Sequence, residues 1–277
     1  NVFVYARNIL LLPILSRELG VSAYGLWAQL YAITELLIPL FLLSLPAAFT
    51  RFHAAETEPR IIKLGFWSSF LVALTSSLAL GVILLILSMP IRDLFGKEMD
   101  QIIDNLWAVI GLVILSVGST TCINYFRTFQ RHFQLCSMLL LESIGFIIFT
   151  LIFSWYGWKI MSPIAGLCAV KIIICIWSIP IIVREIGFCG VDRSIVRKYL
   201  SYSLPLVPMG GLYWIMQMSD RYLIDLYLSK EHVGRYAANY AFGAIITFVY
   251  SPIFIFLMPQ ATKLWESGNL NELKQFL

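Results

Sequence analysis

The chain has 277 residues, of which 59% are hydrophobic and only 13% are charged, and its mean hydropathy is +0.81. Soluble domains carry about 25% charged residues, so a water-soluble globule of this length has no room to bury so much apolar side chain. The formal charge of +4 is too mild for a nucleic-acid-binding module, which clusters its basic residues. These numbers exclude a soluble enzyme, a disordered chain and a nucleic-acid binder, and they predict a polytopic membrane protein.

Eight apolar runs are long enough to cross a bilayer, which takes about 20 residues in a helix. They are too long for the strands of a barrel and lack the alternation of lipid-facing and lumen-facing residues. We therefore predict an all-α protein with about eight transmembrane helices. The runs are residues 1–19, 24–50, 64–89, 105–126, 135–156, 160–183, 200–227 and 232–258.

Basic residues are shared unevenly between the two sets of loops. Loops after even-numbered spans, together with the C-terminal tail, hold eleven Lys and Arg, whereas loops after odd-numbered spans hold six. Short loops rich in Lys and Arg stay on the cytoplasmic side of a membrane. We therefore expect the N-terminus and the even-numbered loops to face the cytoplasm.

Two segments 209 residues apart resemble each other in sequence. Gly25 is matched by Gly234, with aromatic residues and alanines aligned around both, and two prolines seven residues apart follow in each copy, beginning at Pro39 and Pro252. We interpret the match as parallel repeats of six spans, a design in which transporters place the substrate path between two halves.

The repeat predicts a division of the chain into two bundles. Residues 1–183 form the first six-helix bundle, residues 184–199 a cytoplasmic linker, and residues 200–277 the first hairpin of the second bundle with part of the cytoplasmic segment after it. The chain starts inside an apolar run and stops inside a polar, helix-like stretch. We therefore expect it to be a piece of a longer protein.

Two groups of short motifs stand at the beginning of these bundles. They are RNILLLP at 7–13 with LG and YGL within 19–26, and YSLPLVP at 202–208 with SDRYLI at 219–224 and VGRY at 233–236. In these motifs, and in the order of its spans, the chain resembles bacterial oligosaccharide flippases of the O-antigen type. Their superfamily also holds the multidrug antiporters and the lipid II flippase.

The resemblance implies a protein of the bacterial inner membrane that moves undecaprenyl-pyrophosphate-linked sugar units to the outer leaflet. It also implies a polymerase and a ligase of the same surface-polysaccharide pathway as partners, alongside the lipid-linked oligosaccharide and the membrane lipid. By this resemblance, a cationic central cavity holds the anionic pyrophosphate or acidic sugars while the protein alternates its access between the two sides.

Ionisable residues inside apolar spans are costly and usually face a cavity or a partner. Lys171, near the middle of its span, either faces the substrate, which we favour, or pairs with Glu142. Arg7 is a cavity cation or an arginine that snorkels to the inner surface, and Glu35 is its partner or a cation site. The candidate substrate-binding residues are Arg7, Lys171, Arg221, Tyr213, Gln217 and Tyr240, and the candidate coupling or ion-pairing residues are Glu35, Glu142 and Asp220.

Polar residues share a face on each of the last two spans. Tyr213, Gln217 and Asp220 lie at helical spacing on one span, and Tyr236 and Tyr240 on the next. Tyrosines beside polar groups suit sugar rings and hydroxyls, although tyrosine is also common at membrane interfaces. This face is therefore a weak indication of a sugar-binding surface.

Motifs of other functions do not occur in the sequence. There is no GxxxxGK[ST] loop, no GxSxG and no HExxH, and the three histidines lie apart in loops. We expect a transporter rather than an enzyme, with no cofactor and no metal. One alternative is a cation-coupled multidrug antiporter, which prefers an acidic cavity. A membrane-embedded polysaccharide polymerase is a weaker one, because it needs a long external loop or a cluster of His, Asp and Glu.

The bias in basic residues makes a prediction about topology. Single cysteines at Glu58 and Glu98, in a cysteine-free background, are treated on intact cells with a membrane-impermeant thiol reagent. We expect labelling at position 98 and none at position 58, because the even-numbered loops face the cytoplasm. The reverse pattern refutes this orientation.

Overall fold

The predicted all-α membrane fold is confirmed. Every element in the computed structural model is a helix within the residues that it describes, and these group into two compact units, one up to Gln217 and one from Met218 onward. The domain boundaries at residues 183 and 199 stay a prediction. The described residues are 21–54, 56, 58–95, 100–158, 161–228, 232, 236, 239, 240, 243 and 246.

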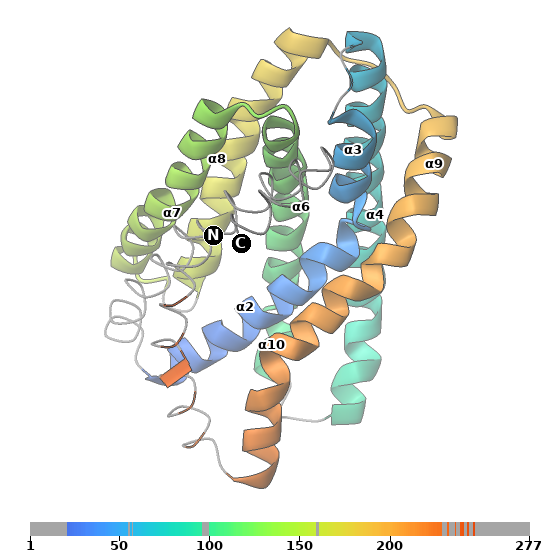
Figure 1. Cartoon of the computed structure of the whole chain (residues 1–277). Helices are drawn as coiled ribbons and strands as arrows, with labels where there is room; N and C mark the ends of the chain where they lie inside the picture. The colour runs from blue at the N-terminus through green and yellow to red at the C-terminus, as the bar shows by residue number, and fades with distance from the viewer. Residues whose placement is uncertain are drawn as a thin grey trace, which may run out of the picture. The chain divides into compact units, whose positions relative to one another are not determined.

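Four described helices are long and apolar enough to cross a membrane. In a bilayer no water satisfies backbone N–H and C=O groups, so an apolar run of this length is stable as a helix. They match the third to sixth predicted spans, and a short helix, α5 (Asp100–Asp104), lies between the first two of them. The four are α4 (Pro59–Phe95), α6 (Leu106–Thr128), α7 (His132–Trp155) and α8 (Met161–Ile186) (Figure 1).

The second predicted span, 24–50, is bent rather than continuous. Helix α2 (Val21–Phe41) and helix α3 (Leu45–His53) meet at an angle of 47°, so the run holds two helices rather than one. The bent pair supplies a fifth membrane crossing if it is counted as one span.

Backbone geometry explains the bend. Leu43 and Ser44 adopt left-handed conformations, with φ of 50° and 52°, which interrupt the helix and change its direction between α2 and α3. Pro46 stands in the first turn of α3, where its missing N–H is not needed. Pro39 removes a hydrogen bond inside α2, one turn before the break.

The seventh predicted span, 200–227, also begins later than expected. A surface helix, α9 (Arg193–Ser203), is followed by one 3-10 turn, η2 (Leu204–Leu206), and then by α10 (Val207–Tyr227). The run at 1–19 and most of the run at 232–258 lie outside the described residues, and most of the second copy of the predicted repeat lies outside them too, so the repeat stays a prediction.

The loops after the second, fourth and sixth predicted spans, which the structure describes, gather at one end of the bundle. Tyr125 Oη on α6 donates to Glu185 Oε2 on α8 at 3.0 Å, and Arg131 Nη2, before α7, lies 3.6 Å from Glu185 Oε1. Trp67 Nε1 on α4 donates to the Gly187 carbonyl at 2.8 Å. This basic end holds the loops that the sequence assigns to the cytoplasm, and the side of the membrane that it faces stays a prediction.

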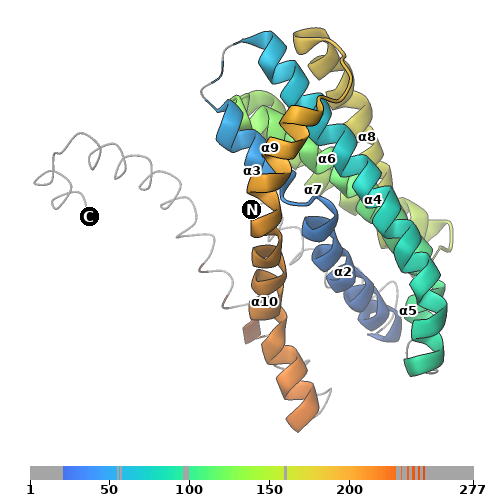
Figure 2. The same ribbon diagram turned by 90° about the vertical axis from the view of Figure 1, so that its right-hand side faces the viewer.

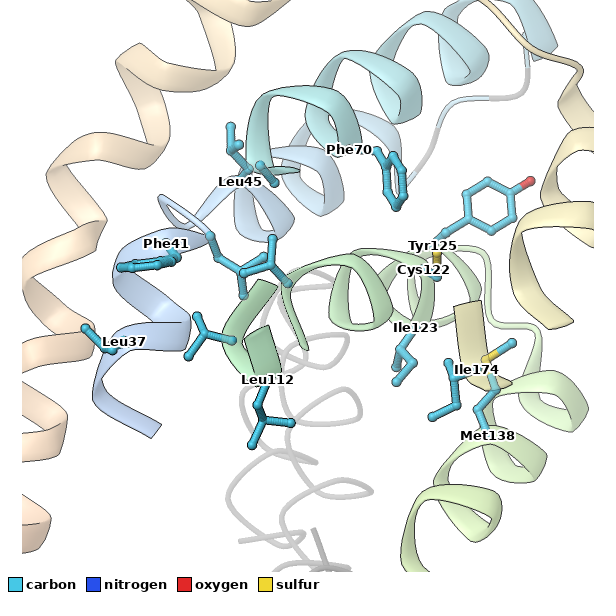
Figure 3. Packing of buried hydrophobic residues seen from close by; sticks show 14 of the residues in the cluster. Leu37, Phe41, Leu45, Phe70, Leu112, Cys122, Ile123, Tyr125, Met138 and Ile174 are labelled. Atoms are coloured by element: carbon cyan, nitrogen blue, oxygen red, sulfur yellow. The ribbon is translucent and has the colours of Figure 1, made fainter. Parts of the chain in front are cut away.

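Buried apolar side chains fill the space between α2, α3, α4, α6 and α8. Figure 3 shows Phe41 and Leu45, on either side of the bend, on the same side of the core as Leu112 of α6. Farther along, Tyr125 meets Phe66 of α4 edge-on at 5.3 Å between ring centroids. The core therefore holds the bent second span against the straight helices.

Helix α9 packs against α3 and α4 (Figure 2), and one of its tyrosines is buried in this contact. Tyr199 is 1% exposed, its hydroxyl lies 3.0 Å from His53 Nε2, and its ring stacks on Phe52 at 5.7 Å. Burial raises the pKa of Tyr199, so the hydroxyl stays protonated and able to donate. The contact needs a glycine on α4, because a Cβ at Gly65 would overlap His53 Nε2 and lie 2.5 Å from Tyr199 Oη.

We expect Gly65→Ala to destabilise the protein by about 1–3 kcal/mol, because the added methyl group forces His53 and Tyr199 apart. The midpoint of thermal unfolding in detergent measures the effect. Gly111→Ala on α6 is the matched control, since a Cβ there meets nothing within 4 Å. Equal melting points for the two variants contradict the role of Gly65 in seating α9.

Candidate functional site

An ion pair joins α7 and α8 near the middle of both helices. Lys171 Nζ lies 2.9 Å from Glu142 Oε1, and the two side chains are 11% and 16% exposed. Each residue stands ten positions after the start of its helix. At about 1.5 Å per residue this is about 15 Å from the nearer helix end, which is the depth of the bilayer centre.

Close packing of α7 on α8 sets the distance between the two charges. This is the most extensive helix pair in the described residues. Gly166 on α8 lies so near α7 that an added Cβ would come within 2.6 Å of Thr150 Oγ1 and 3.0 Å of the Thr150 backbone nitrogen. Small residues permit such an approach of backbones in membrane helices, and here they bring Lys171 and Glu142 into contact.

Aromatic side chains from α2 reach α7 one turn beyond the carboxylate. Phe146 follows Glu142 by four positions and is 2% exposed. Its ring lies 6.3 Å from that of Trp27 on α2, and Trp27 lies 5.3 Å from Tyr31. The bent second span therefore contacts α7 next to the ion pair, so that a movement of α2 reaches the surroundings of Glu142.

The ion pair makes a lysine tolerable at this depth. A charged side chain at the centre of a bilayer costs about 2.5–3.5 kcal/mol on insertion scales. A carboxylate at 2.9 Å offsets that cost, since attraction between opposite charges strengthens as the surrounding dielectric constant falls. Pairing with Glu142 was one of the two interpretations of Lys171, and its contact with substrate stays a prediction.

The other predicted intramembrane pair is only half described. Glu35 on α2 is exposed, and Arg7 lies outside the described residues. The pairing of Glu35 with Arg7 therefore stays a prediction.

The candidate residues on α10 lie along one helix. Tyr213 is 61% exposed, as a residue that meets a ligand or lipid must be. Gln217 and Arg221 belong to the same helix, and their side chains lie outside the described part. Their contact with a substrate stays a prediction.

Asp220 connects α10 to the tyrosines that follow it in sequence. Its carboxylate accepts a hydrogen bond from the Tyr236 hydroxyl and another, at 3.3 Å, from Ser219 Oγ. The rings of Tyr236 and Tyr240 lie 5.9 Å apart, and Tyr240 is 42% exposed. The hydrogen bond between Tyr236 and Asp220 thus links two polar groups that the sequence spacing assigned to separate spans.

The sequence analysis missed a polar cluster between α3 and α6. Asn124 Nδ2 donates to the Pro46 carbonyl at 3.0 Å and to Thr50 Oγ1 at 3.2 Å, and Thr50 shares a further hydrogen bond of 2.9 Å with Thr128. The signal was an amide side chain inside an apolar span, which needs a partner in a membrane. The cluster fixes the second half of the bent span to α6.

Removing one partner of the ion pair should destabilise the protein strongly. We expect Lys171→Met to lose about 3–5 kcal/mol, because it leaves the Glu142 carboxylate inside the membrane without its lysine. Adding Glu142→Gln should restore most of the folded protein, measured as monodisperse protein extracted from membranes and as its melting point.

The control for this pair is Ile172→Met, the same new side chain at a neighbouring position that is 42% exposed. It should match the unmodified protein. If Lys171→Met alone is as stable as this control, the ion pair does not hold α7 and α8 together.

Comparison with known proteins adds the family. A family model described as polysaccharide biosynthesis protein matches residues 1–265. No curated protein and no solved structure matches the chain. The match covers the membrane helices, the ion pair and α9, and it extends over more than half of the sequence. The chain therefore belongs to the polysaccharide biosynthesis protein family.

Proposed function

We propose that this protein is a flippase that moves lipid-linked oligosaccharide units, carried on undecaprenyl pyrophosphate, from the cytoplasmic to the outer leaflet. It works by alternating access, as a transporter and not an enzyme. Membership of the polysaccharide biosynthesis family supports a role in making or exporting a polysaccharide. The flipping step and the lipid-linked substrate are the parts that this proposal adds.

The observation that carries the proposal is the ion pair at mid-membrane depth. Glu142 Oε1 lies 2.9 Å from Lys171 Nζ and neutralises its charge. A pyrophosphate that enters the site competes with Glu142 for the ammonium group, which has three N–H donors and suits phosphate oxygens. The site therefore binds an anion without keeping an unpaired lysine in the membrane between cycles.

Exchange of partners also offers a way to couple transport to an ion. When the substrate takes Lys171, the Glu142 carboxylate has lost its cation in a low-dielectric site. An uptake of a proton or a metal cation there lowers the cost of the buried charge. Glu35 and Asp220 are the further coupling candidates, and Arg7 and Arg221 are the further cations for pyrophosphate.

The sugar part of the substrate needs a different surface. We assign it to Tyr213, Gln217 and Tyr240, because aromatic rings stack on sugar rings and their polar groups bind sugar hydroxyls. The exposure of Tyr213 and Tyr240 supports this assignment. In the cell the protein lies in the bacterial inner membrane with its N-terminus in the cytoplasm, and a polymerase and a ligase use the flipped units.

A cation-coupled multidrug antiporter is the second candidate. Exposed Glu35 and membrane-embedded Glu142 favour it, since a cationic drug binds carboxylates. The family match favours the flippase, because it concerns polysaccharides. A membrane-embedded polysaccharide polymerase has less support.

The test is transport by the full-length protein in proteoliposomes that contain undecaprenyl-pyrophosphate oligosaccharide. A membrane-impermeant glycosidase reports how much sugar becomes reachable from outside. The unmodified protein should make the inner-leaflet share accessible, and Lys171→Arg should keep much of this activity. The stable double variant, with Lys171→Met and Glu142→Gln, should flip at least about tenfold more slowly, because a hydrogen bond to a charged group is worth about 1.5–3 kcal/mol.

The double variant separates the two roles of Lys171, because it keeps the fold while it removes the charge. Flipping by this variant at the unmodified rate removes Lys171 from the mechanism. If the unmodified protein flips no oligosaccharide but exchanges cationic drugs for cations, it is an antiporter instead.

A further inference from the structure

Helix α9 presents its basic side chains away from the bundle. Tyr199 and Ser203 are buried against the bundle, whereas Arg193, Arg197 and Lys198 are exposed. Such an amphipathic helix at the end of a transmembrane bundle has the composition of a helix that lies on a membrane surface.

Two adjoining hollows lie along α9. One is lined by five residues of α9 itself: Arg193, Ser194, Arg197, Lys198 and Ser201. The other shares both arginines and Ser201, and its remaining lining is apolar, from Val72, Val191, Val196 and Leu200. Because the two hollows share three residues, we name them together the α9 groove, an open surface that places basic side chains of α9 beside apolar ones.

Neither arginine of the groove is neutralised by the protein. Within the described residues Arg193 and Arg197 make no salt bridge, and Lys198 Nζ lies over the ring of Phe52 at 4.2 Å. The neighbouring carboxylate, Asp192, is used otherwise, because it accepts from Ser194 N at 2.8 Å and caps α9. These hydrogen bonds lower the pKa of Asp192, so the cap persists at neutral pH.

Apolar surface leads from the membrane to this groove. Val72 belongs to α4, a membrane-spanning helix that also exposes Ile61 and Leu78. On the segment before α9, Phe188 is 63% and Val191 is 47% exposed. The apolar part of the groove therefore lies on elements that expose further apolar side chains, which favours an occupant with an acyl chain over a purely aqueous anion.

We propose that the α9 groove binds an anionic phospholipid of the membrane leaflet at the basic end of the bundle. The phosphate of the head group lies between Arg193 and Arg197, and an acyl chain follows Val72 and Val196. Charge complementarity supplies the attraction, and the apolar part of the groove distinguishes a lipid from free phosphate. The site is separate from the ion pair and does not depend on the proposed transport.

Native mass spectrometry of the full-length protein in mild detergent measures the binding directly. The probes are phosphatidylglycerol and phosphatidylcholine with identical acyl chains. We expect phosphatidylglycerol to bind at least about tenfold more tightly, since each basic side chain near a lipid head group is worth about 1 kcal/mol. Added salt should weaken this preference, and inorganic phosphate should not displace the lipid.

A matched pair of double variants locates the site. Arg193→Gln with Arg197→Gln should abolish the preference for phosphatidylglycerol. Arg60→Gln with Arg127→Gln removes the same charge from exposed positions at the same end, and should keep the preference. Equal melting points in phosphatidylcholine show that both variants fold.

Four results overturn the proposal. Three of them are equal affinity of the unmodified protein for both lipids, a preference that survives in Arg193→Gln with Arg197→Gln, and displacement of the lipid by inorganic phosphate. Binding of undecaprenyl pyrophosphate in the groove without binding of phosphatidylglycerol also overturns it, because the groove is then an entry site for the substrate.

Discussion

The absence of water from the bilayer core is the constraint on which the rest of this structure depends. Each backbone group and each charge at that depth must find its partner within the protein. Within the described residues the constraint makes the apolar runs helical, and it gives Lys171 a carboxylate at 2.9 Å. It also accounts for the amide of Asn124, which donates to the Pro46 carbonyl next to the bend.

Small side chains decide where those contacts form. Lipid is as apolar as leucine, so membrane helices gain little from apolar burial alone and associate by close packing and hydrogen bonds. The approach of α8 to Thr150 at Gly166, and the seating of α9 on α4 at Gly65, both depend on a missing Cβ. The contact at Gly166 lies on the two helices that carry the ion pair, and the contact at Gly65 lies on the buried side of the helix that carries the basic groove. Close helix packing therefore positions the charged groups of both sites.

Hydropathy predicted the four straight spans, because length and apolarity alone determine them. It did not predict the bend after Phe41, since the left-handed conformations of Leu43 and Ser44 leave no trace in hydropathy. Helical spacing placed Lys171 and Glu142 at mid-membrane depth but left both of their interpretations open. Residue spacing shows which residues share a face of one helix, but it does not show which face points toward the neighbouring helix. The packing of α7 against α8 determines that orientation here.

In the proposed flippase, a neutral pair suits the carrier better than a lone lysine does. A carrier must return without its substrate, and an unpaired ammonium group in the membrane costs about 2.5–3.5 kcal/mol on insertion scales. In this proposal the Glu142 carboxylate offsets most of that cost between cycles and gives up Lys171 to an anion with more acceptor oxygens. Because pyrophosphate must displace Glu142 from Lys171 in this proposal, the free energy of the ion pair is subtracted from its binding free energy. The weaker binding favours release of the substrate on the far side of the membrane. An ion pair of moderate strength thus serves both halves of the cycle, and a stronger or weaker one impairs one of them.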